Sequence, residues 1–212
     1  MKVSLLTAAH PAAALAAVFL PWLKNVAAGA QRERRPVAVL VPFRSHAYFL
    51  KAHALAAGVP LLGVHFLTPG ALRDRLARHL GSTARVPLRE HLHLLLAAAA
   101  ERCGEAGSGV AASPDVLLKA IDLLSAGGWK FADAGPVALR PVVAEFERLV
   151  ARAGFQLMHD ADRTLLTGTR AAEPHFAALF VTGFDGLHWP LWPLLSAAAQ
   201  AAASATDRKS VV

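Results

Sequence analysis

Short apolar runs alternate with helix signals along roughly the first third of the chain. The runs lie at 3–7, 37–41 and 64–67, and the run VAVLV at 37–41 is apolar at every position. A short run without polar positions is typical of a central strand that is buried on both faces. The alternation of such strands with helices predicts a parallel sheet with helices packed against it.

Helix boundaries in this part of the chain are marked by proline and by small polar residues. Pro21 is expected to kink or end a helix that begins at Pro11. Ser45 is a candidate N-cap for the second helix. Thr68, followed by Pro69, is a candidate N-cap for the third.

The middle of the chain has helical spacing and no convincing strand. Helices are expected over 87–102, 113–125 and 136–153. The Gly/Ser-rich stretch at 104–109 and the glycine pair at 127–128 are expected to separate them as loops.

The sheet pattern then returns, with a strand expected at 177–182 and a helix from about 190 to 203. The fold class is therefore α/β, with a parallel sheet and an all-helical insertion. We expect residues 1–86 and 172–206 to form the α/β core and residues 87–171 to form the insertion.

The two ends of the chain need separate interpretation. Residues 207–212 (DRKSVV) follow an alanine-rich segment abruptly and are expected to be a non-native tail, which makes the chain the front piece of a longer protein. The apolar stretch after Lys2 resembles a secretion signal, but His10 and Pro11 interrupt it. A secreted protein with a cleaved leader stays open as an alternative, and no membrane partner is expected.

Composition and charge narrow the possible classes of function. With 55% hydrophobic and 17% charged residues, the chain is typical of a packed protein and not of a disordered one. The net charge of +7 is compatible with a nucleic-acid partner, although solvated arginines on helix surfaces would give the same value. The single cysteine, Cys103, excludes an internal disulfide and favours a reducing, cytoplasmic location.

Catalytic and cofactor motifs are missing from the sequence. The residues after Thr7 (AAHPAAA) lack the glycines and the lysine of a Walker A phosphate loop, and no G-x-G-x-x-G fingerprint is present. His159, Asp160 and Asp162 form a small polar group that fits a turn better than a metal site. We therefore expect no cofactor, no metal and no complete catalytic site.

Three segments together resemble the AddB/RexB-type component of the AddAB/RexAB ATP-dependent helicase/deoxyribonuclease, a PD-(D/E)XK nuclease family protein. They are VAVLVPFRSHAYFLKAHAL at 37–55, VHFLTPGALRDRL at 64–76 and LFVTGFDGLHWPLWPLLSAAA at 179–199. The resemblance implies a helicase-like N-terminal domain with a P-loop NTPase (RecA-like) fold and a helical insertion. It also implies a helicase/nuclease partner subunit and a role in double-strand-break repair, with the nuclease domain lying far downstream.

The chain departs from the family at two places, after Thr7 and at Thr182, where the family has an aspartate before Gly-Phe. Asp185 follows three residues later and is not expected to replace it. The resemblance therefore implies a noncatalytic domain that serves as a scaffold and contacts DNA.

Four residues are candidates for binding single-stranded DNA: Arg44, Ser45, His46 and Thr68. They follow the strands at 37–41 and 64–67, where parallel strands present their loops and the helix starts attract phosphate. Arg44 can add a charge-assisted contact. The alternative is that Ser45 and Thr68 only cap helices and Arg44 is a solvated charge.

The competing hypothesis for the function of the protein is a small intracellular α/β enzyme or ligand-binding domain with its pocket at the strand ends.

Overall fold

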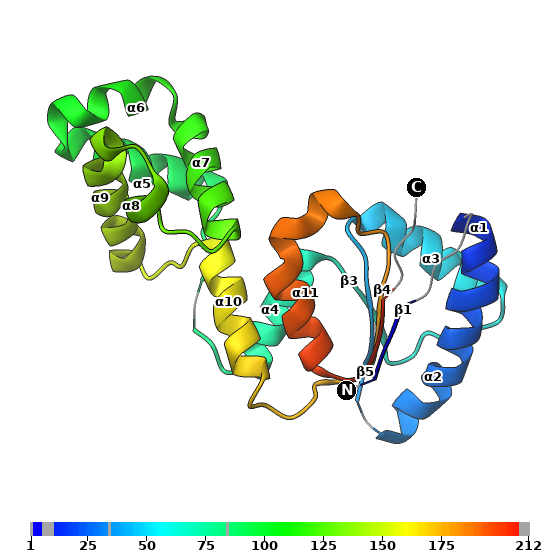
Figure 1. Cartoon of the computed structure of the whole chain (residues 1–212). Coiled ribbons are helices and arrows are strands. Elements are labelled where there is room, and N and C mark those ends of the chain that lie inside the picture. The colour runs from blue at the N-terminus through cyan, green and yellow to red at the C-terminus, as the bar shows by residue number, and fades with distance from the viewer. Residues whose placement is uncertain (1, 6–10, 34, 84, 208–212) are drawn as a thin grey trace. The chain divides into compact units, whose positions relative to one another are not determined.

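The computed structural model describes residues 2–5, 11–33, 35–83 and 85–207 (Figure 1). The chain divides into two compact units, which we call unit 1 (1–82 and 165–212) and unit 2 (83–164). The sequence placed the corresponding boundaries a few residues later, at 87 and 171. Helix α10 (Met158–Thr169) contains the second boundary, so that it contributes residues to both units.

Unit 1 contains a five-stranded sheet in the order β1-β5-β4-β2-β3, and every neighbouring pair is parallel. The α/β class and the placing of the four expected strands in one parallel sheet are therefore confirmed. The strands are β1 (Lys2–Leu5), β2 (Val37–Leu40), β3 (Val64–Leu67), β4 (Phe176–Val181) and β5 (Ala202–Asp207).

Strand β5 was not predicted. The expected helix through residue 203 is wrong at its end, because α11 (Trp192–Gln200) stops and the chain enters the sheet at Ala202. Alanine favours helix in isolation, but the place between β4 and β1 buries Ala202 and Ala205 and pairs their backbones on both sides. Asp207, assigned to the tail from the sequence, is the last residue of β5 and pairs with Leu5 and Val181.

Helices cover both faces of this sheet (Figure 1). One face packs against η1 (Leu15–Phe19), which continues α1 (Pro11–Ala14), and against α2 (Leu20–Glu33) and α3 (Arg44–Ala56). The other face packs against α4 (Pro69–His79), the later part of α10, and α11. The alternation along β2 follows from this arrangement, since Val39 faces the first set of helices and Leu40 the second.

Pro21 does not end the first helix, although ending it was one of the two outcomes expected. The π-helical segment η1 comes directly before it, and the Leu20 N–H donates to the Leu15 carbonyl, five residues back. Proline disrupts a regular α-helix because it lacks an N–H and clashes with the carbonyl four residues earlier. The shifted pairing of the π turn accommodates Pro21, so that helix continues to Glu33.

Unit 2 is entirely helical within the described residues, apart from an isolated bridge between Arg85 and Phe155. Its own core includes Leu96, Ile121, Phe131 and Phe146. Its helices are α5 (Arg89–Arg102), η2 (Gly104–Gly107), α6 (Ser108–Ala112), α7 (Pro114–Ala126), α8 (Phe131–Ala134), η3 (Val137–Leu139) and α9 (Arg140–Arg152), together with the start of α10.

The stretch at 104–109 was expected to be a loop, but it forms η2 and the start of α6. A Cβ added to Gly107 would lie 1.9 Å from the Ala100 carbonyl oxygen. Glycine therefore lets η2 fold back directly against α5.

Glu145 on α9 joins two helices of unit 2. Its carboxylate accepts hydrogen bonds from Arg148 on the same helix and, at 3.0 Å, from Arg102 at the end of α5. Hydrogen bonds from Arg148 and then Arg102 lower the pKa of Glu145 from 4.5 to about 2.

We predict that Glu145→Gln destabilises the protein at neutral pH and loses this effect in acid. A carboxyl group whose pKa is lower in the folded state stabilises it above the unfolded pKa of 4.5, and that contribution disappears as the pH falls towards about 2. Urea unfolding of wild type and variant at a series of pH values measures the difference. Glu101→Gln on α5 is the control, and a difference that stays constant with pH would contradict the assignment.

Candidate functional site

The candidate DNA-binding residues lie where the strand order of the sheet reverses. The chain leaves β2 towards α3 on one face, and it leaves β4 towards η4 (Gly186–Leu191) and α11 on the other. Since β2 and β4 are neighbours, their loops leave the sheet side by side and in opposite directions. In parallel α/β sheets this switch point, at the carboxyl ends of the strands, is where ligands bind. We call this end of unit 1 the carboxyl edge.

Arg44, Ser45, His46 and Thr68 all lie at the carboxyl edge. The Val41 N–H donates to the Leu67 carbonyl at 3.0 Å, which holds the first three, after β2, beside Thr68, after β3. Arg44 and Ser45 are exposed, whereas His46 and Thr68 are half-buried.

Ser45 is not the N-cap of α3, contrary to expectation. The helix begins at Arg44, so that Phe43 occupies the cap position and Ser45 lies inside the first turn. Thr68 does occupy the N-cap position of α4, but its side chain makes no capping hydrogen bond. Within the described residues, therefore, neither hydroxyl is engaged in a helix cap.

Gly183 brings the loop after β4 into close contact with the start of α3. Its backbone has φ +81°, and a Cβ there would lie 2.7 Å from the His46 ring and 3.1 Å from Pro42. Glycine is therefore required both by the left-handed conformation and by the approach of His46. The resulting burial lowers the pKa of His46 below its usual 6.5.

Asp185 and His188 form a second contact, at the start of η4. The Asp185 carboxylate accepts the Leu187 N–H at 2.9 Å and contacts His188 Nδ1 at 2.7 Å. Hydrogen bonds from His188 and then from the Leu187 N–H lower the pKa of Asp185. The Asp185 carboxylate caps η4 through the Leu187 N–H, and the His188 ring lies 6.4 Å from that of Phe43. Asp185 therefore has a structural role, in keeping with the expectation that it does not replace the acid missing at Thr182.

Exposed apolar side chains surround these loops. Phe43, Leu187, Trp189 and Trp192 are 62%, 85%, 48% and 64% exposed, and all belong to segments that follow β2 or β4. Trp189 and Trp192 therefore lie outside the core, and Trp129 in unit 2 is likewise exposed.

Comparison of the sequence with protein-family models and with curated proteins finds no match. The arrangement of residues at the carboxyl edge therefore carries the functional argument.

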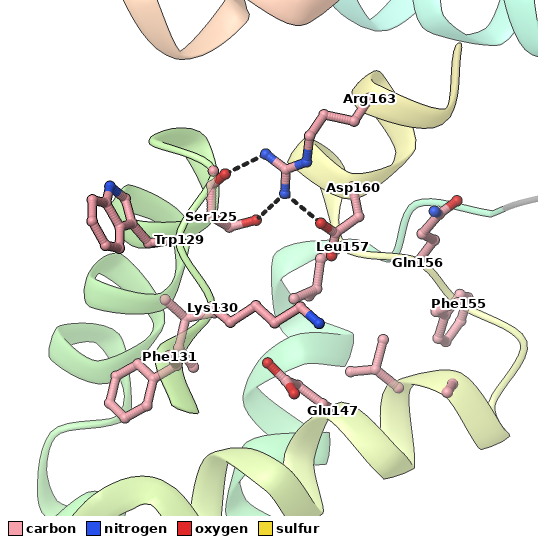
Figure 2. Close-up of a pocket in the computed structure, with 14 residues that line it drawn as sticks. Ser125, Trp129, Lys130, Phe131, Glu147, Phe155, Gln156, Leu157, Asp160 and Arg163 are labelled. Carbon is pink, nitrogen blue, oxygen red and sulfur yellow. Dashed lines mark hydrogen bonds and ion pairs between the residues drawn. The ribbon is translucent and has the colours of Figure 1, made fainter. Parts of the chain in front are cut away.

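A separate cavity of about 430 Å³ lies within unit 2 and was not predicted from the sequence (Figure 2). Its apolar lining includes Phe131, Phe155 and Leu157. Another part of its wall is α10, which the sequence suggested as a turn because of His159, Asp160 and Asp162. These residues instead belong to an amphipathic helix, and His159 and Asp162 are buried.

The charged groups of this cavity are balanced. The Arg163 guanidinium donates to the Ser125 carbonyl, to the Ser125 hydroxyl at 3.2 Å and to Asp160. The Lys130 side chain extends across the cavity towards Glu147 (Figure 2). Burial, followed by the charge of Asp160, raises the pKa of Glu147, and Lys130 opposes this shift. Two acidic and two basic side chains therefore line this cavity.

The structure also bears on three other features considered in the sequence analysis: a metal site, the phosphate loop and a membrane span. Among the described residues no group of three or more His, Cys, Asp or Glu side chains is arranged to hold a metal ion. The segment after β1, where the phosphate loop is missing from the sequence, falls at residues 6–10 and lies outside the described residues. Within the part of the chain that the structure describes, no helix combines the length and apolar character needed to cross a membrane.

We predict that Gly183→Ala destabilises the fold by about 2–4 kcal/mol, since it combines left-handed strain with a clash against His46. Two matched glycines separate these causes. Gly58 has φ +70° but open space around its Cβ position, whereas Gly186 has open space and no left-handed φ. Gly58→Ala should cost about 1–2 kcal/mol and Gly186→Ala less than about 0.5 kcal/mol. Denaturant unfolding measures all three, and equal effects for Gly183 and Gly58 would show that the His46 contact is unimportant.

Proposed function

We propose that this chain is a noncatalytic, helicase-like domain that contacts single-stranded DNA through the carboxyl edge of its sheet. Its parent would be a subunit of a helicase/nuclease complex that repairs double-strand breaks, with a second helicase/nuclease subunit as partner. The proposal includes a sheet of P-loop NTPase (RecA-like) type, with which the all-parallel sheet of unit 1 is compatible. The observation that carries it is the grouping of exposed aromatic side chains with Arg44 at the switch point.

Single-stranded nucleic acid needs two kinds of contact, and the carboxyl edge offers both. Bases stack on exposed aromatic faces, each contact contributing about 1–3 kcal/mol, and every base can do so. Phe43, Trp189 and Trp192 are exposed for this role. Phosphates need cations and donors, and Arg44 has no ion pair among the described residues, while the Ser45 and Thr68 hydroxyls are free of capping bonds.

The two units differ in net charge, and this difference favours DNA binding at unit 1. Unit 1 contains 13 Lys and Arg against 5 Asp and Glu, whereas unit 2 contains 9 against 10. The net charge of the chain therefore resides in the unit that contains the sheet. A polyanion is attracted to such a surface over several ångströms, and salt weakens that attraction.

We predict that Arg44→Ala weakens binding of oligo-dT and lowers the slope of log affinity against log salt by about one. Trp189→Ala should cost about 1–3 kcal/mol of binding free energy and leave the slope unchanged, because stacking releases no counterions. Thr68→Ala should weaken binding with an unchanged slope. Fluorescence anisotropy of labelled oligo-dT across a salt series measures affinity and slope together.

The matched controls for this experiment are Arg152→Ala and Trp129→Ala, which remove an exposed arginine and an exposed tryptophan from unit 2. Neither should change the affinity. If the three carboxyl-edge variants bind like wild type while keeping their fold, the carboxyl edge does not contact DNA, and the small α/β enzyme or ligand-binding domain becomes the better hypothesis.

The same proposal predicts that the protein does not hydrolyse ATP, with or without DNA. The Walker A residues are missing from the sequence after Thr7, Thr182 replaces the acid, and Asp185 is engaged in a helix cap. Phosphate release at saturating ATP and oligo-dT measures this. DNA-stimulated turnover that survives purification to constant specific activity would refute it.

A further inference from the structure

Five basic residues lie near the amino ends of the strands, away from the carboxyl edge. We call them the basic cluster: His65 on β3, Arg75, Arg78 and His79 on α4, and His175 directly before β4. His65 lies on the same face of the sheet as Leu67, which packs against α4. Arg75, Arg78 and His79 lie three and four residues apart, so they share one side of α4.

Direct contacts join three members of the basic cluster, Arg75, His79 and His175. The Arg75 Nε–H donates to His175 Nε2 at 3.1 Å, and the Arg75 guanidinium lies 6.0 Å from the centre of the Phe176 ring. The His79 and His175 rings are 4.4 Å apart, and His79 Nε2 donates to the Glu173 carbonyl at 3.1 Å.

The hydrogen bond from Arg75 fixes the protonation of His175. An arginine Nε–H can only donate, so Nε2 of His175 must carry a lone pair and its proton must lie on Nδ1. Burial, followed by the charges of His79 and Arg75, lowers the pKa of His175 to about 4. His175 is therefore neutral at physiological pH and presents one N–H donor.

The positive charge of the cluster is not compensated by acidic side chains. Burial, then Arg75 and then Lys51 lower the pKa of His65, and burial followed by the charge of Arg78 lowers that of Arg75. Within the described residues none of the five cluster members is within ion-pair distance of a carboxylate.

Glu173 and Asp74 are close in sequence to members of the cluster, and within the described residues neither carboxylate forms an ion pair with them. The Glu173 carboxylate lies 4.0 Å from Arg35 and is 90% exposed. Arg78 donates to the backbone carbonyl of Asp74 and not to its carboxylate.

We infer that the basic cluster is a binding site for a phosphate group. Arg75 and Arg78 supply charge-assisted donors, His175 supplies a neutral N–H, and His65 can supply another from a third element. Donors from several directions suit the oxygens of a tetrahedral oxyanion, and its charge would offset the repulsion within the cluster. The phosphate can belong to a free phosphate compound or to a nucleic-acid backbone. The inference does not rest on the carboxyl edge, which belongs to the other end of the strands.

The structural alternative is that Arg78 and His79 only stabilise the carboxyl end of α4, where a helix attracts cations. The two roles differ in measurable ways. A helix-end role predicts a loss of stability without any response to phosphate. A phosphate site predicts a specific response of the histidine rings.

The test uses the full chain and follows the ring nitrogens of His65 and His175 by long-range ¹H–¹⁵N NMR during titration with inorganic phosphate. Chloride at matched ionic strength is the reference. The rings should shift with phosphate and not with chloride, and the pKa of His65 should rise when phosphate binds, because a nearby anion favours the protonated ring.

Arg75→Gln should weaken phosphate binding about tenfold or more, in line with the loss of one charge-assisted hydrogen bond. Arg75→Lys should retain part of the affinity, and Arg152→Gln in unit 2 should match wild type.

Oligo-dT without a terminal phosphate, used as a second titrant, identifies the source of the phosphate group. Ring shifts with both titrants indicate a nucleic-acid backbone, and shifts with phosphate alone indicate a free phosphate compound. Absence of ring shifts with either titrant overturns the inference, whatever the stability of the variants.

Discussion

The pairing of β2 with β4 is the interaction on which the candidate site depends. These strands come from either side of unit 2 in the sequence, yet their register places Leu40 opposite Val181. Both strands are largely buried, so hydrophobic burial on two faces stabilises the pairing. Unit 2 has a core of its own, and the chain between the strands is therefore not closed as a long flexible loop. Only this pairing brings the loop at Gly183 to the start of α3.

Local pattern was sufficient for the parts of the fold in which burial and propensity agree. The run at 37–41 needs a central strand, and no other environment buries it on both faces. Strand β5 shows the opposite case, because alanine at 202 and 205 favours helix until neighbouring strands offer backbone partners. Pro21 shows a third case, since the π turn that accommodates it has no signature in a pattern of apolar positions. The local sequence pattern therefore predicts the strand at 37–41 but misses both β5 and the π turn.

The candidate site was predictable in position but not in detail. The rule that loops after parallel strands share one edge is enough to place Arg44 and Thr68 together. The contact between Gly183 and His46 joins two segments far apart in the sequence, and no residue spacing in the sequence predicts it. The basic cluster is harder still, because His65, Arg75 and His175 come from three elements and none belongs to a motif. Exposure of the tryptophans could be learned only from the structure.

The net charge of a protein does not show which of its arginines are paired with carboxylates and which are not. In unit 2, Arg89, Arg102, Arg148 and Arg163 each pair with an aspartate or glutamate, so their charges are locally compensated. In unit 1, Arg44, Arg75 and Arg78 make no such pair within the described residues. Uncompensated cations produce a field that reaches beyond the surface, whereas paired ones largely cancel. The residues of unit 1 include more cations than carboxylates, and the fold leaves Arg44, Arg75 and Arg78 without an acidic partner within the described residues. Composition and folding together therefore give this unit a positive surface for a polyanion.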